Sequence, residues 1–258
     1  MIDENPGRSR NETSSDRMLS VIDLFSPERP EWTVEEACAV LGQSESTVYR
    51  HFRTLTSAGL IFSYWPGRYL LGPGIAHYDR QLRLSDPLLR TAESALTELA
   101  TEFSGPGSLF VSRLFRDHVM TMHEHRIGAG LAEGVFARGR LAPLFGGAPA
   151  FAIVSFLEVR AVRAMHRRSG ADADGWLEIK RRMRAVRAQR YALGVDEPDT
   201  GVTHVSVPLL QVDGGVIGSL SLASPSGMHD AAETDDIVGA LTRASEAIAS
   251  RIGGDAVR

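Results

Sequence analysis

The sequence has little cysteine, no long hydrophobic run and no excess of positive charge. Its single cysteine, Cys38, can form neither an internal disulfide nor a thiolate zinc site, which fits a reducing cytoplasm. Arg, Gly or Pro interrupts the longest apolar runs, so we expect no membrane-spanning helix. Lys and Arg number 28 against 32 Asp and Glu, and the net charge of −4 does not by itself favour binding to nucleic acid.

The length and composition suit two domains. A chain of 258 residues can hold a small domain and a larger one, and 43% hydrophobic with 23% charged residues is ordinary for a globular protein. Residues 1–15 are polar and acidic without an apolar core, so we expect a disordered tail and no signal peptide. Positive charge is local, because residues 44–68 contain three arginines and one acid, a net charge of +2.

Residues 44–59 have the pattern of an amphipathic helix. At ~100° per residue, Val48, Phe52 and Leu55 fall within about 60° of one another and form a narrow apolar stripe. Ser44 is a suitable N-cap, whose hydroxyl can accept from an unpaired backbone N–H, and Gly59 suits the left-handed turn after the helix. The opposite face carries hydroxyl and guanidinium groups, on Ser46, Tyr49, Arg50, Arg53 and Ser57. Such a face is either a solvated surface or a binding surface.

The preceding residues predict that this helix belongs to a helix-turn-helix. Residues 15–25 have helical periodicity, and Thr33 with Glu36 forms the capping box of a second helix that ends at Gly42. Only two residues separate that helix from the next one, and two helices joined by a turn containing Gly form a helix-turn-helix.

A hairpin is expected directly after the helix-turn-helix. Two β-prone runs, residues 61–65 and 68–71, flank the turn residues Pro66 and Gly67. A helix-turn-helix followed by a hairpin is a winged helix, here expected over residues 16–76, and its second motif helix enters the major groove of DNA. Alternatively, the hairpin only covers the core.

The rest of the chain predicts linking helices and an α+β domain. Residues 77–103 have an apolar helical stripe, and Pro87 is expected to begin a new helix within them. Residues 104–258 alternate between strand and helix patterns and close with a helix over 230–251. The segment THVSVPLLQVDGGVIGSLSLA predicts two strands around a hairpin turn. The fold class is therefore α+β, with an antiparallel sheet covered by helices.

The segments STVYRHFRTLTSAGLI and YLLGPGI resemble the DNA-binding domain of the IclR family of bacterial transcription regulators. The resemblance implies a winged helix-turn-helix, linker helices and a GAF-like domain that binds a small-molecule effector and forms oligomers. It also implies a cytoplasmic homodimer, or a dimer of dimers, on a pseudo-palindromic operator in double-stranded DNA. The residues expected to contact DNA are Ser44, Ser46, Thr47, Tyr49, Arg50, Arg53 and Arg68.

Two C-terminal regions resemble the family's effector pocket, namely RLAPLFGGAPAFAIVSFL and the strands GVTHVSVPLL and GVIGSLSLASP. Members that bind small organic acids have Asp, Cys and Ser at positions where this chain has Gly194, His204 and Ala223, and Phe145 replaces a histidine. Losing polar partners while gaining Phe and His favours a larger, more aromatic or apolar ligand. A collapsed pocket in a domain that only assembles the oligomer is the alternative. The candidate effector-binding residues are Leu144, Phe145, Gly146, His204, Ser206, Ser219 and Ser221.

Other candidate sites are less well supported by the sequence. His123 and His125 share one face of a strand and could hold a metal with His118 or His204. A pairing of Ser221 with His204 lacks a third, orienting group and an oxyanion site. We therefore expect no metal site, no cofactor and no enzymatic activity. The remaining alternatives are a ligand-binding enzyme or an interaction protein that retains a vestigial DNA-binding domain.

One further stretch could be mistaken for a nucleic-acid patch. KRRMRAVRAQR, residues 180–190, is the most basic part of the chain. Its arginines recur at helical spacing and its Met and Val lie on another side, so a solvated helix face is expected.

Overall fold

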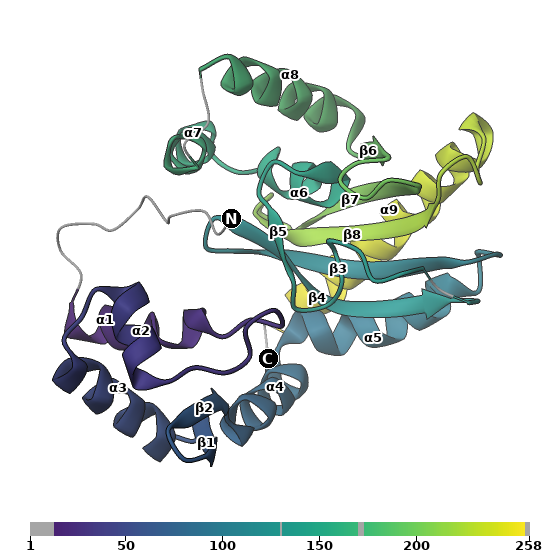
Figure 1. Ribbon diagram of the computed structural model, residues 1–258. Helices are drawn as coiled ribbons and strands as arrows, with labels where there is room; N and C mark the ends of the chain where they lie inside the picture. Colours follow the sequence, from purple (N-terminus) through teal and green to yellow (C-terminus); the bar gives the residue numbers. More distant parts are fainter. Residues whose placement is uncertain (1–12, 130, 170–172, 256–258) are drawn as a thin grey trace. The chain divides into compact units, whose positions relative to one another are not determined.

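The computed structural model describes residues 13–129, 131–169 and 173–255, and the chain divides into two units, Met1–Ser85 and Asp86–Arg258 (Figure 1). The boundary falls within the expected linker helices. The first helix begins earlier than expected, because Ser14 and Ser15 are helical and belong to no disordered tail. Thr13 caps this helix: its hydroxyl accepts from the Asp16 N–H at 3.2 Å, and the Asp16 carboxylate accepts from the Thr13 N–H at 2.9 Å. Residues 1–12 lie outside the described part of the chain.

The N-terminal unit is a winged helix followed by one further helix. Its elements are α1 (Ser14–Leu19), a 3₁₀ turn (Ile22–Leu24), α2 (Val34–Leu41), α3 (Glu45–Ser57), β1 (Ile61–Trp65), β2 (Arg68–Leu71) and α4 (Pro73–Ser85). The expected capping box of Thr33 and Glu36 opens α2, and Gly42 ends it in a left-handed conformation with φ +61°. The strands β1 and β2 pair antiparallel around Pro66 and Gly67, as predicted.

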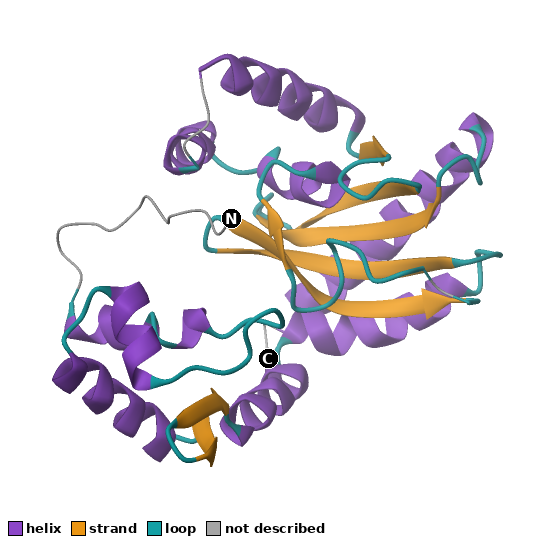
Figure 2. Ribbon diagram, in the orientation of Figure 1, coloured by secondary structure: helices purple, strands orange, loops and turns teal. Residues whose placement is uncertain are grey.

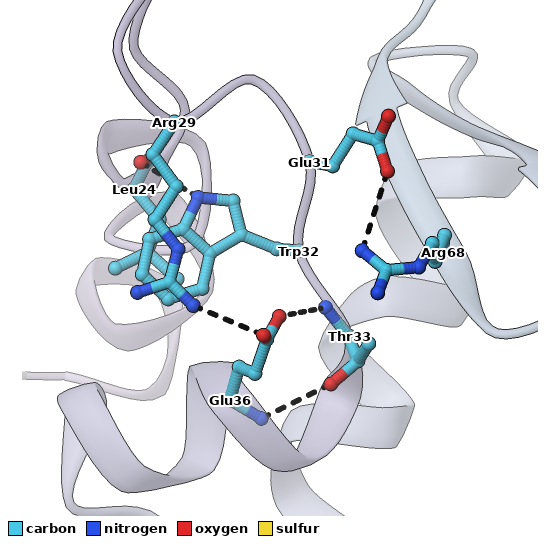
Figure 3. A network of polar contacts seen from close by, with 7 residues as sticks. All are labelled: Leu24, Arg29, Glu31, Trp32, Thr33, Glu36 and Arg68. Carbon is cyan, nitrogen blue, oxygen red and sulfur yellow. Dashed lines mark hydrogen bonds and ion pairs between the residues drawn. The ribbon is translucent and has the colours of Figure 1, made fainter.

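The core of this unit lies between α3, α2 and the hairpin. Its buried residues are Val21, Trp32, Ala37, Leu41, Val48, Phe52, Leu55 and Ile61. Trp32 adds a short backbone bridge to Tyr69 of β2, and its indole N–H donates to the Leu24 carbonyl at 2.9 Å (Figure 3). The Arg29 guanidinium lies 3.4 Å above the Trp32 ring and 3.3 Å from Glu36. The loop before α2 is therefore attached to both the helices and the hairpin.

A backbone contact joins the end of the hairpin to α4. Gly72 donates to the Leu60 carbonyl at 2.7 Å, and Gly74 donates to the Gly59 carbonyl at 2.8 Å. A Cβ atom at position 72 would lie 2.2 Å from the Gly59 oxygen, so only glycine allows this approach.

The C-terminal unit is an antiparallel sheet with helices on both faces (Figure 2). The strands are β3 (Gly107–Phe115), β4 (His118–Ile127), β5 (Leu141–Pro143), β6 (Ala192–Val195), β7 (Val202–Leu210) and β8 (Val216–Pro225), in the order β5-β4-β3-β8-β7-β6. The helices are α5 (Pro87–Ala100), α6 (Gly147–Val154), α7 (Val159–Arg168), α8 (Ala173–Gln189) and α9 (Ala231–Asp255). The short strands β5 and β6, at the two edges of the sheet, were not expected from the sequence.

Each face of this sheet packs against its own hydrophobic core. Leu109, Val111, Leu220 and Leu222 pack with residues of α5 and α9 on one face. On the other face, Phe110 and Ala223 pack with residues of α6, and every residue of α6 is buried. Asp86 caps α5 by accepting from the N–H groups of Leu88 and Leu89, and Pro87 begins the helix as predicted. None of the described helices is both long and apolar enough to cross a membrane.

Candidate nucleic-acid interface and ligand cavity

Helix α3 presents one buried and one exposed face, as its sequence predicts. Val48, Phe52 and Leu55 are at most 1% exposed and hold the helix on the core. The other face is exposed at Ser46, Tyr49, Arg50, Arg53 and Ser57. Two guanidinium groups and three hydroxyls on one helix face can contact phosphates and base edges in a groove.

The N-terminus of α3 differs from the expectation in one respect. Ser44 is the N-cap residue, but its side chain accepts no hydrogen bond from a backbone N–H. Its hydroxyl instead lies 2.9 Å from the Thr47 hydroxyl and 3.3 Å from that of Ser46. The predicted cap hydrogen bond is therefore wrong, and three neighbouring hydroxyls lie together at the positive end of the helix.

Arg68 lies at the start of β2, beside the hairpin turn. Its Nη1 atom is 3.3 Å from the Glu31 carboxylate, and about half of its side chain is exposed, 53% (Figure 3). Exposed ion pairs of this kind contribute at most about 1 kcal/mol, so a phosphate can replace Glu31 at small cost. Arg68 is thus available to DNA while also linking the hairpin to the loop before α2.

His51 is a buried residue of α3 that no motif in the sequence marks. It is 3% exposed, and neither of its ring nitrogens has a hydrogen-bond partner among the described residues. Burial, together with the charges of Arg50 and Arg17, lowers the pKa of His51 from its ordinary value of 6.5. The neutral ring is therefore the form that the folded unit holds.

We expect the N-terminal unit to lose stability as the pH falls below about 6.5, the ordinary pKa of histidine. Because the folded pKa is depressed, the unfolded chain binds more protons below this pH, and stability is fully present only above it. The free energy of opening of residues 45–57, from amide hydrogen exchange, should be smaller at pH 5.5 than at pH 7.5. His51→Leu should reduce this difference, whereas equal values for the native chain at both pH values would contradict it.

In the C-terminal unit, the sheet face beneath α6 carries rows of small polar side chains. The register places Ser112 opposite Ser219, Phe110 opposite Ser221, and Ser108 opposite Ala223. The Ser206 hydroxyl donates to that of Ser221 at 2.8 Å. The hydroxyls of Ser206, Ser219 and Ser221 are fully buried, so this part of the face is closed.

Three of the four departures from the family's acid-binding pattern lie in one row of the sheet. Gly194 pairs with His204, and His204 pairs with Ala223, on β6, β7 and β8. His204 is 2% exposed, and its Nδ1 atom has no hydrogen-bond partner among the described residues. Burial lowers the pKa of His204, although Asp199, a hydrogen bond to the Glu197 backbone and the Glu197 charge act in the opposite direction. The His204 ring is therefore neutral in the folded unit.

A small cavity of about 40 Å³ borders this row. Its lining residues are Ser108, Phe110, Glu124, Arg126, Leu131, Ala132, Glu133, Gly134, Phe136, Ala137, Asp199, Val202, His204 and Ala223. Of the seven residues predicted to bind the effector, His204 is the one that lines it. Glu124, Phe136 and Asp199 were missed, because they come from a neighbouring strand and two loops that no local motif marks.

The other predicted pocket residues lie elsewhere on the same side of the sheet. Leu144 is buried in the core beside α6, and Phe145 is half-buried, with its ring edge toward His166 at 5.7 Å. Gly146 is the N-cap of α6. Ser206, Ser219 and Ser221 belong to the closed rows described above. These six therefore surround α6 and do not line the cavity.

In the described part of the chain, no three His, Cys, Asp or Glu residues are arranged to hold a metal ion. Ser221 accepts from Ser206, whereas His204 lies opposite Ala223, so the Ser221–His204 pair does not form.

The basic stretch is only partly a solvated face. Met183 and Val186 of α8 are buried, as expected. Arg187 donates to the Leu157 carbonyl at 2.8 Å and to that of Ser155, and Arg182 lies 2.8 Å from Glu197 and 4.0 Å above the Phe151 ring. These two arginines fix α8 to the unit.

The winged helix has a counterpart among known protein families. Residues 14–61 match the family model of the IclR helix-turn-helix domain. The N-terminal unit therefore contains an IclR helix-turn-helix domain. The match covers α1, α2 and α3 and ends at the first residue of β1.

Relatives match the chain along most of its length. The HTH-type transcriptional regulator XynR of Escherichia coli K12 is 25% identical over 248 residues, which cover 93% of this chain and 97% of XynR. An IclR transcriptional regulator from Alicyclobacillus acidocaldarius has a similar fold, with a TM-score of 0.75, 24% identity, and coverage of 93% and 98%. An IclR homolog from Microbacterium hydrocarbonoxydans, solved in complex with 4-hydroxybenzoate, has a TM-score of 0.73, 14% identity, and coverage of 94% and 100%.

Proposed function

We propose that this protein is a sequence-specific DNA-binding transcriptional regulator of the cytoplasm, controlled by a small molecule bound in its C-terminal unit. The exposed face of α3 is the observation that carries the proposal. Ser46, Tyr49, Arg50 and Arg53 share that face, on a helix whose other side is buried in the core. The Ser and Tyr hydroxyls fix the position on phosphates, and the arginines contact guanine edges or phosphates.

The cavity beside His204 supports control by an effector. A ligand can switch DNA binding only if it binds the two DNA-binding states with different affinity. The relative from Microbacterium hydrocarbonoxydans was solved with 4-hydroxybenzoate, an aromatic compound. The rings of Phe110, Phe136 and His204 give this cavity an aromatic wall as well.

The test is to select binding sites from fragmented genomic DNA with the purified protein at two salt concentrations. A recurring palindrome that persists at the higher salt concentration is expected, because base contacts resist salt better than phosphate contacts do. Binding that shows no sequence preference and disappears at higher salt would contradict the proposal.

A second copy of the chain is proposed to pack on α4. This helix buries none of its residues within the structure, although its apolar side chains are spaced for one face. Ile75, Tyr78 and Leu82 follow one another at intervals of three and four residues and are 37%, 56% and 40% exposed. Such a stripe on an exposed helix is typical of pairing between helices, and a dimer also presents two recognition helices to a palindrome.

We expect the double variant Tyr78→Glu, Leu82→Glu to be monomeric. Two carboxylates within the proposed interface would have to be buried without partners, so the dimer should dissociate and operator affinity should fall at least about tenfold. Light scattering during size exclusion reports the mass. Arg80→Glu changes the charge of the same helix at an exposed position outside the stripe and is the control. An unchanged oligomeric mass in the double variant would show that α4 is not the interface.

A further inference from the structure

The cavity in the C-terminal unit has an aromatic wall at one side. The rings of Phe110 and Phe136 are nearly parallel, at an interplanar angle of 20° with centroids 5.9 Å apart. The His204 ring is edge-on to both, at 6.2 Å from Phe110 and 5.3 Å from Phe136. All three residues are at most 4% exposed.

The polar groups of the cavity are mainly hydrogen-bond acceptors. The Oε1 atom of Glu124 accepts a hydrogen bond from the Ser108 hydroxyl at 2.7 Å and lies 3.5 Å from the Arg126 Nε atom. Both Asp199 carboxylate oxygens lie 3.1 Å from the Val135 nitrogen, a backbone donor that they share.

The third acceptor is His204. Its ring donates to the backbone of Glu197, and Nδ1 is left without a partner. In a neutral imidazole with one nitrogen donating, the other nitrogen carries a lone pair and accepts. Nδ1 is therefore an unsatisfied acceptor in a residue that lines the cavity.

The net charge of the residues that line the cavity is negative. Glu124, Glu133 and Asp199 are the acids, and Arg126 is the cation, which gives a formal charge of −2 with a neutral His204. The Arg126 side chain is 56% exposed and already lies beside Glu124. A ligand carboxylate would thus approach two partly buried carboxylates with one solvated arginine to balance them.

We propose that the effector is an aromatic amine, with its ammonium group held by Glu124 and Asp199 and its ring against Phe110 and Phe136. Carboxylates attract the ammonium group, the faces of aromatic rings attract cations, and a neutral imidazole accepts an N–H. This inference rests on the proposed function, because it names the ligand class of the same effector site. It also explains why the acid-binding pattern is lost along the whole row of Gly194, His204 and Ala223.

Matched pairs of small molecules test the inference. Binding of tyramine and benzylamine to the full chain is compared by calorimetry with binding of 4-hydroxyphenylacetate and benzoate, which have the same rings and a carboxylate. The amines should bind at least tenfold more tightly than the acids. Glu124→Gln and Asp199→Asn should each weaken tyramine binding at least tenfold. Glu178→Gln, which removes an exposed carboxylate on α8, should leave it unchanged.

The outcomes separate this inference from the proposed function. Tighter binding of either acid, or equal tyramine binding by Glu124→Gln and the native chain, would overturn it. Absence of amine binding up to millimolar concentration would also overturn it, and if operator binding is intact, the proposed function would stand. Asp199 also accepts a hydrogen bond from the Val135 backbone, so Asp199→Asn can change binding by disturbing the fold. Circular dichroism detects such a disturbance. If it is found, tyramine binding by Glu124→Gln decides between the outcomes.

Discussion

Replacing Phe52 with Ala should destabilise the N-terminal unit by about 3–5 kcal/mol, the cost of removing a buried aromatic side chain and leaving a cavity. Phe52 is 1% exposed, and its ring lies edge-on to Tyr69 with centroids 4.8 Å apart. It therefore joins α3 to β2 across the middle of the core. Since whole domains are stable by only about 5–15 kcal/mol, much of this unit should be unfolded, and operator binding should be lost with it.

Urea unfolding followed by tryptophan fluorescence measures this effect, because Trp32 is part of the same core. Tyr49→Ala is a matched control from the same helix: its side chain is 59% exposed, so its stability change should stay within about 0.5 kcal/mol. The two variants should therefore differ in folding even where both bind DNA poorly. An unchanged unfolding midpoint for Phe52→Ala would mean that the core is arranged differently.

Arg50→Ala should weaken operator binding about 10- to 100-fold while leaving the fold intact. Arg50 is exposed on α3 and has no ion-pair partner among the described residues, so its guanidinium is available to DNA. A contact to a base or phosphate by such a group is worth about 1–3 kcal/mol. Fluorescence anisotropy with the selected operator, at several salt concentrations, gives both the affinity and its salt dependence.

Arg50→Lys distinguishes the two kinds of contact. A lysine keeps the charge but loses the two parallel donors, so it should restore most of the affinity at a phosphate and little at a guanine. Arg17→Ala removes the same charge from an exposed position on α1 and is the control. If Arg50→Ala binds the operator as tightly as the native chain at physiological salt, α3 is not the recognition helix.

The winged helix could be predicted from sequence because its signals are local. The capping box of Thr33 and Glu36 spans four residues, and Pro66 with Gly67 specifies the hairpin turn by itself. The apolar stripe on α3 indicated which side is buried. His51 lies on that side and escaped notice, because a histidine in a polar-looking run does not reveal whether its nitrogens find partners.

The cavity could not be predicted in the same way, because strand register and loop packing create it. Ser108 meets Ala223 only once β3 pairs with β8, and Asp199 reaches the Val135 backbone across 64 residues of chain. The resemblance to the family identified His204 as a candidate, because this residue occupies a position within a family motif. It could not supply Glu124, whose side chain is placed by the pairing of β4 with β3.

The glycine contact between the hairpin and α4 bears on which operators the proposed dimer can accept. Because Gly72 and Gly74 rest directly against the Gly59 backbone, α4 has no free linker residues before it and is joined stiffly to the hairpin that follows α3. Two chains paired through α4 would therefore keep their recognition helices at one separation. The distance between half-sites would then be encoded far from any base contact, and a change at residue 72 could alter the permitted spacing while leaving the half-site sequence the same.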